Sequence, residues 1–211
     1  MLDRRRFCST LLSAAALGAA PAVWAQSDAP IHLLVGFPPG GGSDAIARLL
    51  AEKLQADLGR PVLVDNRPGA GGQLAGQQLK AARADGTTLF LSHDHTLSIL
   101  PQVVKKPGFD PQTDFEPVGG IATFVNGLAV SGGTPARSVS EFIAWVRKQG
   151  GQAGIGIPAP ASTPEFLVQL LGKKYDLKLT PVPYKGSAPM MADMLGNQIP
   201  AGVGSVPDFI E

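Results

Sequence analysis

Short apolar runs alternate with amphipathic segments along the first part of the chain, and this alternation restricts the fold more than any other feature of the sequence. The run at residues 31–35 is followed by a segment at 44–58 whose apolar residues recur at helical spacing. The same order repeats with an apolar run at 62–64, a helical segment at 73–84 and a run at 87–91. Strands that are separated by helices pair in parallel, with the helices on the faces of the sheet. The sequence therefore predicts an α/β fold that begins with a parallel sheet.

A second α/β unit is expected from about residue 123 onward. Ser138 followed by Glu141 forms a capping-box pattern at the start of its first helix. Further helices and strands alternate after it, with helices at 138–149, 164–174 and 188–195 and strands at 155–157, 179–184 and 199–203. We therefore divide the chain into a leader at residues 1–25, a first lobe at 26–122 and a second lobe at 123–211.

The first 25 residues have the pattern of a secretory signal peptide. A basic cluster at residues 4–6 precedes a short apolar stretch at 11–20, and small residues precede a cleavage site after Ala25. The apolar stretch is too short to span a bilayer as a mature helix. The basic cluster fits an ordinary Sec signal and also loosely fits a twin-arginine signal. The expected location of the mature chain is the periplasm.

The charge and the cysteine content of the mature chain exclude several classes of function. The whole chain has a formal net charge of +1, and removal of the leader takes away three arginines and one aspartate. A near-neutral surface disfavours binding to nucleic acid or to a membrane surface. The single cysteine, Cys8, lies in the leader, so the mature chain has neither a disulfide nor a cysteine metal site.

A glycine-rich turn, GFPPGGGSD at residues 36–44, joins the first strand to the first helix. Gly42 stands where a phosphate-binding loop has its lysine, so we reject nucleoside triphosphate hydrolysis. The pattern G-x-G-x-x-A at 40–45, with Asp65 at the end of the second strand, weakly matches a dinucleotide-binding motif. A helix start offers unpaired N–H groups and partial positive charge, so a carboxylate or phosphate is the expected ligand. The alternative is a tight turn without a ligand, in which Ser43 is the helix N-cap.

Other turns are expected to lie near this one. Residues 66–72 and 92–96 follow neighbouring strands, and the carboxyl ends of parallel strands meet at one edge of a sheet. In the second unit a helix begins with Ser162 or Thr163 as its N-cap, and Lys185 follows another strand as a candidate cation at the rim. Two α/β units that aim helix starts at one cleft would form an anion-binding clamp.

A metal site and a catalytic site are both disfavoured. His93, Asp94 and His95 are suitable types of metal ligand, but only His32 is available as a further histidine. We interpret them as polar loop residues that face the cleft. No serine lies in a G-x-S-x-G elbow, and an Asp next to a His in sequence rarely gives the geometry of a catalytic triad. We therefore expect no enzyme activity, no metal and no cofactor.

Nearly all of the chain after the leader resembles the periplasmic receptors of tripartite tricarboxylate transporters, the TctC or Bug family. The resemblance lies in five stretches in family order: FPPGGGSDAIARLLAEKL, VDNRPGAGG, ADGTTLFL, DFEPVG and VPYKGSAPMMADMLGNQI. It implies a two-lobed, periplasmic-binding-protein-like (type II) fold in a monomer with the ligand between the lobes. It also implies capture of a small carboxylate, either a di- or tricarboxylate, an acidic amino acid or an aromatic acid. The receptor would deliver this acid to permease subunits in the membrane.

The resemblance also implies which residues contact the ligand. Members of the family hold the carboxylate largely through main-chain N–H groups and waters, without a metal. The matching positions lie in the first glycine-rich turn, in the turn after the third strand and at the second-lobe helix start. They are Phe37, Gly40, Gly41, Gly42, Ser43, Asp44, Ser92, His95, Ser162 and Thr163.

The sequence departs from the family pattern in several places. Residues 158–161 replace a glycine-rich run, Phe166 replaces a common histidine, and Leu100 replaces an asparagine, which makes the expected pocket more apolar. Relatives continue beyond the position of Glu211, so the chain resembles a C-terminally truncated member whose second lobe and hinge return are incomplete. Exposed apolar surface is expected as a result. A dinucleotide-binding oxidoreductase-like protein and an inactive truncated remnant are the alternative interpretations.

Overall fold

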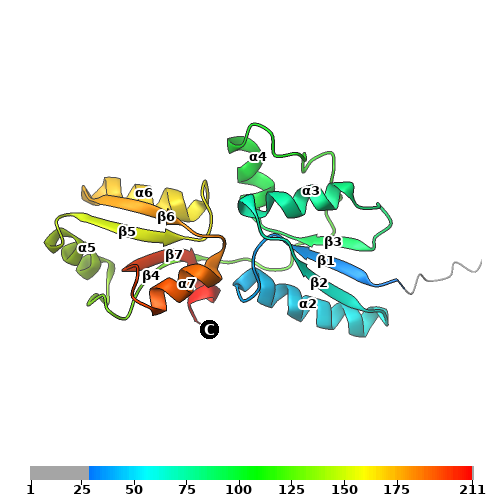
Figure 1. Ribbon diagram of the computed structural model, residues 1–211, viewed down its shortest axis with the longest axis horizontal. Helices are drawn as coiled ribbons and strands as arrows, with labels where there is room; N and C mark the ends of the chain where they lie inside the picture. Colours follow the sequence, from blue (N-terminus) through cyan, green and yellow to red (C-terminus); the bar gives the residue numbers. More distant parts are fainter. Residues whose placement is uncertain (1–28, 211) are drawn as a thin grey trace, which may run out of the picture.

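The computed structural model describes residues 29–210, which form two α/β lobes that lie side by side (Figure 1). The predicted signal peptide lies outside the described residues. The first lobe contains β1 (Ile31–Val35), α2 (Gly42–Leu58), β2 (Val62–Asn66), η2 (Ala70–Gly72), α3 (Gln73–Ala81), β3 (Thr88–Leu91), η3 (His95–Ile99) and α4 (Leu100–Val103). The second lobe contains β4 (Asn126–Val130), α5 (Val139–Lys148), β5 (Gln152–Ile157), α6 (Thr163–Tyr175), β6 (Lys178–Pro183), α7 (Ser187–Leu195), β7 (Ala201–Ser205) and η4 (Val206–Phe209).

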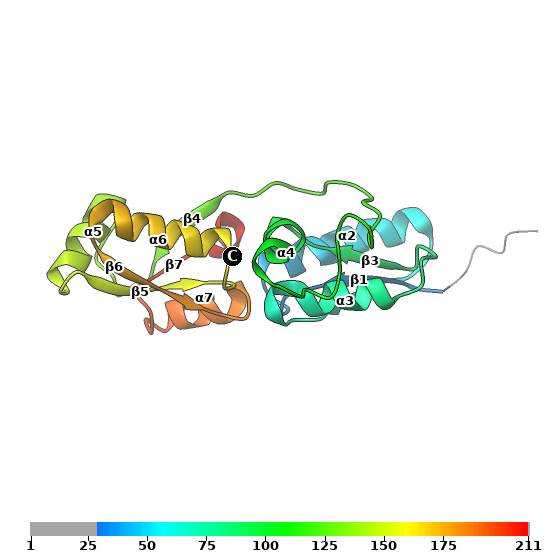
Figure 2. The same ribbon diagram turned by 90° about the horizontal axis from the view of Figure 1, so that it is seen from above.

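The first lobe is built on a three-stranded parallel sheet in the order β2-β1-β3. Helix α2 covers one face of this sheet and α3 covers the other (Figures 1 and 2). Alternate residues of β1, Ile31, Leu33 and Val35, pack in one buried cluster with Ala47 and Ala51 of α2. Small alanines let the helix lie close to the central strand, and both are buried. The predicted parallel sheet with helices on its faces is confirmed.

The second lobe has a four-stranded sheet in the order β4-β7-β5-β6. The pairs β5–β6 and β5–β7 are parallel, whereas β4 runs antiparallel to β7. Helices α5 and α6 lie on one face of the sheet and α7 on the other (Figure 2). The main core joins Phe142 and Val146 of α5, Val168 of α6 and the β5 residues Ile155 and Ile157. Among residues 29–210, no helix has the length and the apolar character needed to cross a bilayer.

Helix boundaries show where the local sequence signals were right and where they were wrong. Helix α2 begins at Gly42 with Gly41 as its N-cap, so Ser43 is not the N-cap that the alternative of a tight turn without a ligand required. The physical reason is that the N–H groups of Asp44 and Ala45 already donate to the Gly41 carbonyl, which places Ser43 inside the first turn. Helix α5 begins as predicted, because Ser138 is its N-cap and the Ser138 side chain accepts a hydrogen bond from the Glu141 N–H.

An extended segment connects the lobes and exposes apolar side chains. It runs along one side of the molecule from the first lobe to β4 (Figure 2). Val118 is 86% exposed and Val125 is 72% exposed, and Ile121 and Phe124 between them are also exposed. Exposed apolar groups that follow one another in this way promote association between molecules.

Replacing Val118 by serine and Val125 by threonine is expected to reduce self-association of the chain at high concentration. The free energy of unfolding should change by less than about 0.5 kcal/mol, because both side chains already face water. Analytical ultracentrifugation and a thermal melt would measure the two effects. The control is Leu195→Ser on α7, where an exposed apolar side chain lies outside the connecting segment. An equal reduction by the control would contradict a special role for this segment.

Candidate ligand-binding site

A pocket of about 240 Å³ lies between the two lobes. The first lobe lines it with the turns at residues 36–38 and 68–71, and the second lobe lines it with residues 158–160 and 183–186. These turns lie at the ends of β1, β2, β5 and β6, whose carboxyl ends all point toward the junction of the lobes (Figure 1). Ligands of parallel α/β sheets bind at this edge. The pocket is therefore in the position that the sheet topology predicts for a ligand site.

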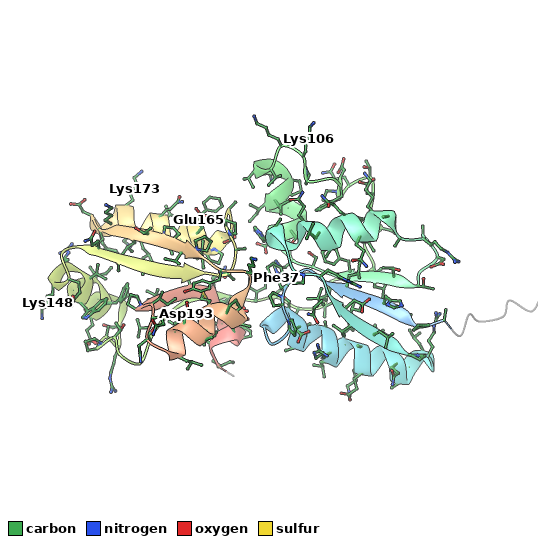
Figure 3. The ribbon with its side chains drawn as sticks, in the orientation of Figure 1. Phe37, Lys106, Lys148, Glu165, Lys173 and Asp193 are labelled. Carbon is green, nitrogen blue, oxygen red and sulfur yellow. The ribbon has the colours of Figure 1, made fainter. Side chains whose placement is uncertain are left out.

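The walls of the pocket are mainly apolar. Phe37 lies between the two lobes (Figure 3), and Lys185 is the one cationic side chain among the residues that line the pocket. The hydroxyl group of Tyr184 donates a hydrogen bond to Asp193 at 2.6 Å. Burial and this hydrogen bond raise the pKa of Tyr184 to about 12. Five of the lining residues are prolines: Pro38, Pro68, Pro158, Pro160 and Pro183.

The two first-lobe turns that line the pocket lie against each other. A Cβ atom on Gly36 would lie 2.6 Å from the Cα atom of Gly72, so a larger residue at position 36 would force the turns apart. Gly71 has a positive φ of 66°, and a Cβ atom there would lie 2.4 Å from Nε2 of His95. Glycine is required at both positions for the strands to end so close together.

Asp44 holds the glycine-rich turn from inside the first lobe. Its carboxylate accepts hydrogen bonds from the Gly40 N–H at 3.0 Å, from Arg48 Nε at 2.9 Å and from Asn66 Nδ2 at 2.9 Å. Burial raises the pKa of this carboxyl, but the hydrogen bonds from Arg48, Gly40 and Asn66 outweigh burial, so the pKa is lowered. Asp44 thus fixes the path of the turn and is not among the residues that line the pocket.

The start of α2 faces the second lobe. The Gly42 N–H donates a hydrogen bond to the carboxylate of Asp208 at 2.9 Å. Asp65, the acid of the weak dinucleotide-binding motif, lies 2.9 Å from His32 Nδ1. The N–H group of Gly42 and the carboxylate of Asp65, which a dinucleotide would use, are therefore both engaged with other residues of the chain.

Two histidines, His93 and His95, lie in the turn that follows β3; His95 is buried and His93 is partly buried. Burial lowers the pKa of His93, although the carboxylates of Asp94 and Asp208 oppose this shift. Burial also lowers the pKa of His95; the neighbouring His93 adds to this effect, while Asp94 and the backbone of Ala161 oppose it. Since an unperturbed histidine titrates near 6.5, both imidazoles are neutral at pH 7.

These histidines face protein more than solvent. The ring of His93 stacks on Phe37, with ring centroids 4.9 Å apart. Ser92 Oγ, His93 Nδ1 and both ring nitrogens of His95 are buried without a hydrogen-bond partner of ordinary geometry. Within the described part of the chain, no group of three His, Cys, Asp or Glu residues is placed to hold a metal ion.

The start of α6 in the second lobe has Ser162 at the predicted N-cap position, but the Ser162 side chain does not cap the helix. The Ser162 hydroxyl instead donates to the Ala159 carbonyl at 2.6 Å. The Glu165 carboxylate accepts from the Ala161 N–H at 2.5 Å, and Thr163 is the first helical residue. Ser162 therefore shapes the turn that carries Ala159 into the pocket.

Of the predicted ligand contacts, Phe37 lines the pocket directly. The remaining ones are not among the lining residues: Gly40, Gly41, Gly42, Ser43 and Asp44 lie at the start of α2, Ser92 and His95 follow β3, and Ser162 and Thr163 lie at the start of α6. The predicted ligand contacts did not include residues 68–71 or 183–186, although the turn at 66–72 was expected at the same sheet edge and Lys185 was a candidate cation at the rim. The strand-edge rule pointed to both segments, because each follows a strand whose carboxyl end reaches the pocket.

Two α/β lobes with a pocket between the carboxyl ends of their strands define the class of two-lobed solute-binding proteins. Residues 46–210 match the family model of the tripartite tricarboxylate transporter family receptor, TctC. The chain belongs to this family, whose members are periplasmic binding proteins.

Similar proteins are known in sequence and in structure. Protein BugT of Bordetella pertussis is 33% identical over 187 residues, which cover 86% of this chain and 56% of BugT. A solved structure of an R. palustris protein with adipate has a TM-score of 0.80 at 32% identity and covers 85% of this chain and 60% of that chain. MatC of Rhodopseudomonas palustris with bound malate has a TM-score of 0.74 at 26% identity, covering 85% of this chain and 61% of MatC. The chain thus spans about 60% of the length of the relatives that it matches.

Proposed function

We propose that this chain is an extracytoplasmic receptor that captures a small carboxylate in the pocket between its lobes and delivers it to the membrane permease of a tripartite tricarboxylate transporter. The observation that carries this proposal is the position of the pocket, at the carboxyl ends of strands from both lobes. The relatives that were solved with adipate and with malate support the class of ligand. The signal-peptide pattern of the first 25 residues supports export to the periplasm.

The chemistry of the lining residues supports an acid with an apolar body. Lys185 can attract the carboxylate, and main-chain N–H groups of lining residues such as Ala70 and Ala159 can donate hydrogen bonds to it, whereas those of Tyr184 and Gly186 already donate to Ile157 and Pro158. Phe37 and the proline rings offer apolar surface to the rest of the molecule. The pocket requires no metal or cofactor for this role, and we propose no chemical step.

A thermal-shift screen of the purified chain with organic acids tests the proposed function. The panel contains adipate, malate, glutamate and benzoate, with NADH as the representative of the dinucleotide alternative. A ligand that binds only the native state stabilises it by roughly 2.7 kcal/mol at a hundredfold excess over Kd. At least one acid is expected to raise the melting temperature. A shift with NADH and with none of the acids would contradict the receptor function. A melt without a cooperative transition would favour the inactive remnant.

Lys185→Ala is expected to weaken binding of the acid found in the screen by about fivefold. An exposed ion pair contributes up to about 1 kcal/mol, which corresponds to roughly this factor in Kd. Isothermal titration calorimetry would measure the change. The matched control is Lys178→Ala, because Lys178 is an exposed lysine at the opposite end of β6. An equal loss in both variants would show that Lys185 acts through the overall charge and not through a contact in the pocket.

A further inference from the structure

The carboxylate of Asp208 is bound by groups from both lobes. Its Oδ1 atom accepts hydrogen bonds from the Gly42 N–H and from the Ser187 hydroxyl, each at 2.9 Å. Its Oδ2 atom accepts from the Ser205 hydroxyl at 2.6 Å. Gly42 is the first residue of α2 in the first lobe, whereas Ser187 begins α7 and Ser205 ends β7 in the second. One side chain therefore connects the start of α2 to two elements of the opposite lobe.

The start of α2 is well suited to receive this carboxylate. The first N–H groups of a helix have no partner within the helix, and partial positive charge gathers there. The N-cap residue Gly41 has no side chain that could accept a hydrogen bond from them. An anion from elsewhere in the molecule can take this place, and the Asp208 carboxylate does so from the second lobe.

The fit between the lobes at this point depends on glycine. A Cβ atom on Gly42 would lie 2.8 Å from Asp208 Oδ1, and a Cβ atom on Gly41 would lie 2.7 Å from Ser187 Oγ. A side chain at either position would displace the Ser187 hydroxyl or the Asp208 carboxylate from this contact. The hydroxyl groups of Ser187 and Ser205 donate to the same carboxylate from its own lobe.

The contact lies at the edge of the candidate pocket. Gly186, which lines the pocket, directly precedes Ser187. A Cβ atom on Gly186 would lie 2.8 Å from Cδ of Pro38, a lining residue of the first lobe. The contact between Gly42 and Asp208 is therefore adjacent to the place where the two pocket walls approach each other.

We propose that Asp208 is a positioning residue that latches the two lobes together by occupying the N-terminus of α2. The latch sets the spacing of the pocket walls and uses a carboxylate of the chain itself, so it acts in the absence of solute. The latch goes beyond the proposed function. Only an effect of the latch on the affinity for a solute would rest on that function.

The distance between the lobes tests this proposal. Spin labels on Ala56→Cys in α2 and Lys173→Cys in α6 place one probe on an exposed position of each lobe. Cys8, the one cysteine of the native chain, is replaced by serine so that only these sites are labelled. Pulsed electron paramagnetic resonance on the full chain without ligand should give one narrow distance distribution. In Asp208→Ala the population at longer distances should rise about tenfold, as expected for the loss of about 1.4 kcal/mol of hydrogen bonding.

Two further variants keep the result unambiguous. Asp208→Asn retains the size of the side chain and one acceptor oxygen, so it should fold and show a smaller increase in the long-distance population. Asp57→Ala removes an exposed carboxylate from α2 and should leave the distribution unchanged. An unchanged distance distribution in folded Asp208→Ala, or in folded Asp208→Asn if the alanine variant does not fold, would overturn the latch. Because no ligand is present, this outcome is independent of whether any acid binds in the screen.

Discussion

Phe142→Ala is expected to lower the free energy of unfolding by about 3–5 kcal/mol, the largest effect of any single change considered for this chain. Phe142 is 1% exposed and belongs to the core that joins α5, α6 and the second sheet. Its ring also stacks on Trp145, with centroids 6.0 Å apart. Truncation removes this buried area and leaves a cavity that the surrounding strands fill only in part. Denaturant titration followed by circular dichroism would measure the loss.

The matched control for this change is Val139→Ala. Val139 lies on the same helix and is 46% exposed, so its truncation should change the free energy of unfolding by no more than about 0.5 kcal/mol. If the two variants were equally stable, the face of α5 that is assigned to the core would be wrong.

Asp44→Ala is expected to destabilise the chain by about 2–4 kcal/mol. Asp44 is 4% exposed, and its carboxylate accepts hydrogen bonds from Gly40, Arg48 and Asn66. Hydrogen bonds to a charged group contribute about 1.5–3 kcal/mol each and do not add fully, so the loss of all three stays within about 2–4 kcal/mol. Chemical denaturation at pH 7 would measure the effect, with the exposed Asp57→Ala as the control on the same helix.

The pH dependence of Asp44→Asn provides a second test of the same network. The pKa of Asp44 is lower in the folded state than its ordinary value of 3.8. Its contribution to stability is therefore fully present above about pH 4 and is lost as the pH falls through the folded-state pKa. The wild-type chain should lose this contribution below pH 4, and Asp44→Asn should not. The histidines, whose pKa values are lowered, also reduce stability as the pH falls below about 6.5, but both proteins contain them, so the difference between the two profiles reports Asp44. Parallel pH profiles of the two proteins would argue against the Asp44 network.

The fold could be predicted to the level of its sheets because the relevant signals are local. Apolar runs and helical spacing along residues 31–91 specify strands and helices in alternation, and alternation determines a parallel sheet. Ser138 and Glu141 lie three residues apart, so the start of α5 could be read directly. The alternative with Ser43 as the N-cap of α2 is wrong, because the carbonyl of Gly41 begins the helix and the Asp44 side chain holds the turn before it.

The candidate site was less predictable, because its residues come together only in the tertiary structure. The sequence identified the correct edge of each sheet but not which residues at that edge line the pocket. The N–H groups at the start of α2 were assigned to a ligand, yet Gly42 donates to Asp208, which is 166 positions away. Sequence patterns relate residues a few positions apart, so they could not predict a hydrogen bond between Gly42 and Asp208. Likewise, Lys185 was identified only as a candidate rim cation, although it is the cation of the pocket lining.

The five prolines of the pocket lining have a consequence for how a solute is selected. Each ring fixes one backbone torsion, so the walls lose little conformational freedom when a molecule enters between them. A proline also has no N–H group, so hydrogen-bond donors are confined to the intervening positions, such as Ala70 and Ala159. An acid that enters this cavity meets a rigid template with donors at fixed intervals. Its oxygen atoms must match that template, because the walls cannot rearrange to match the acid.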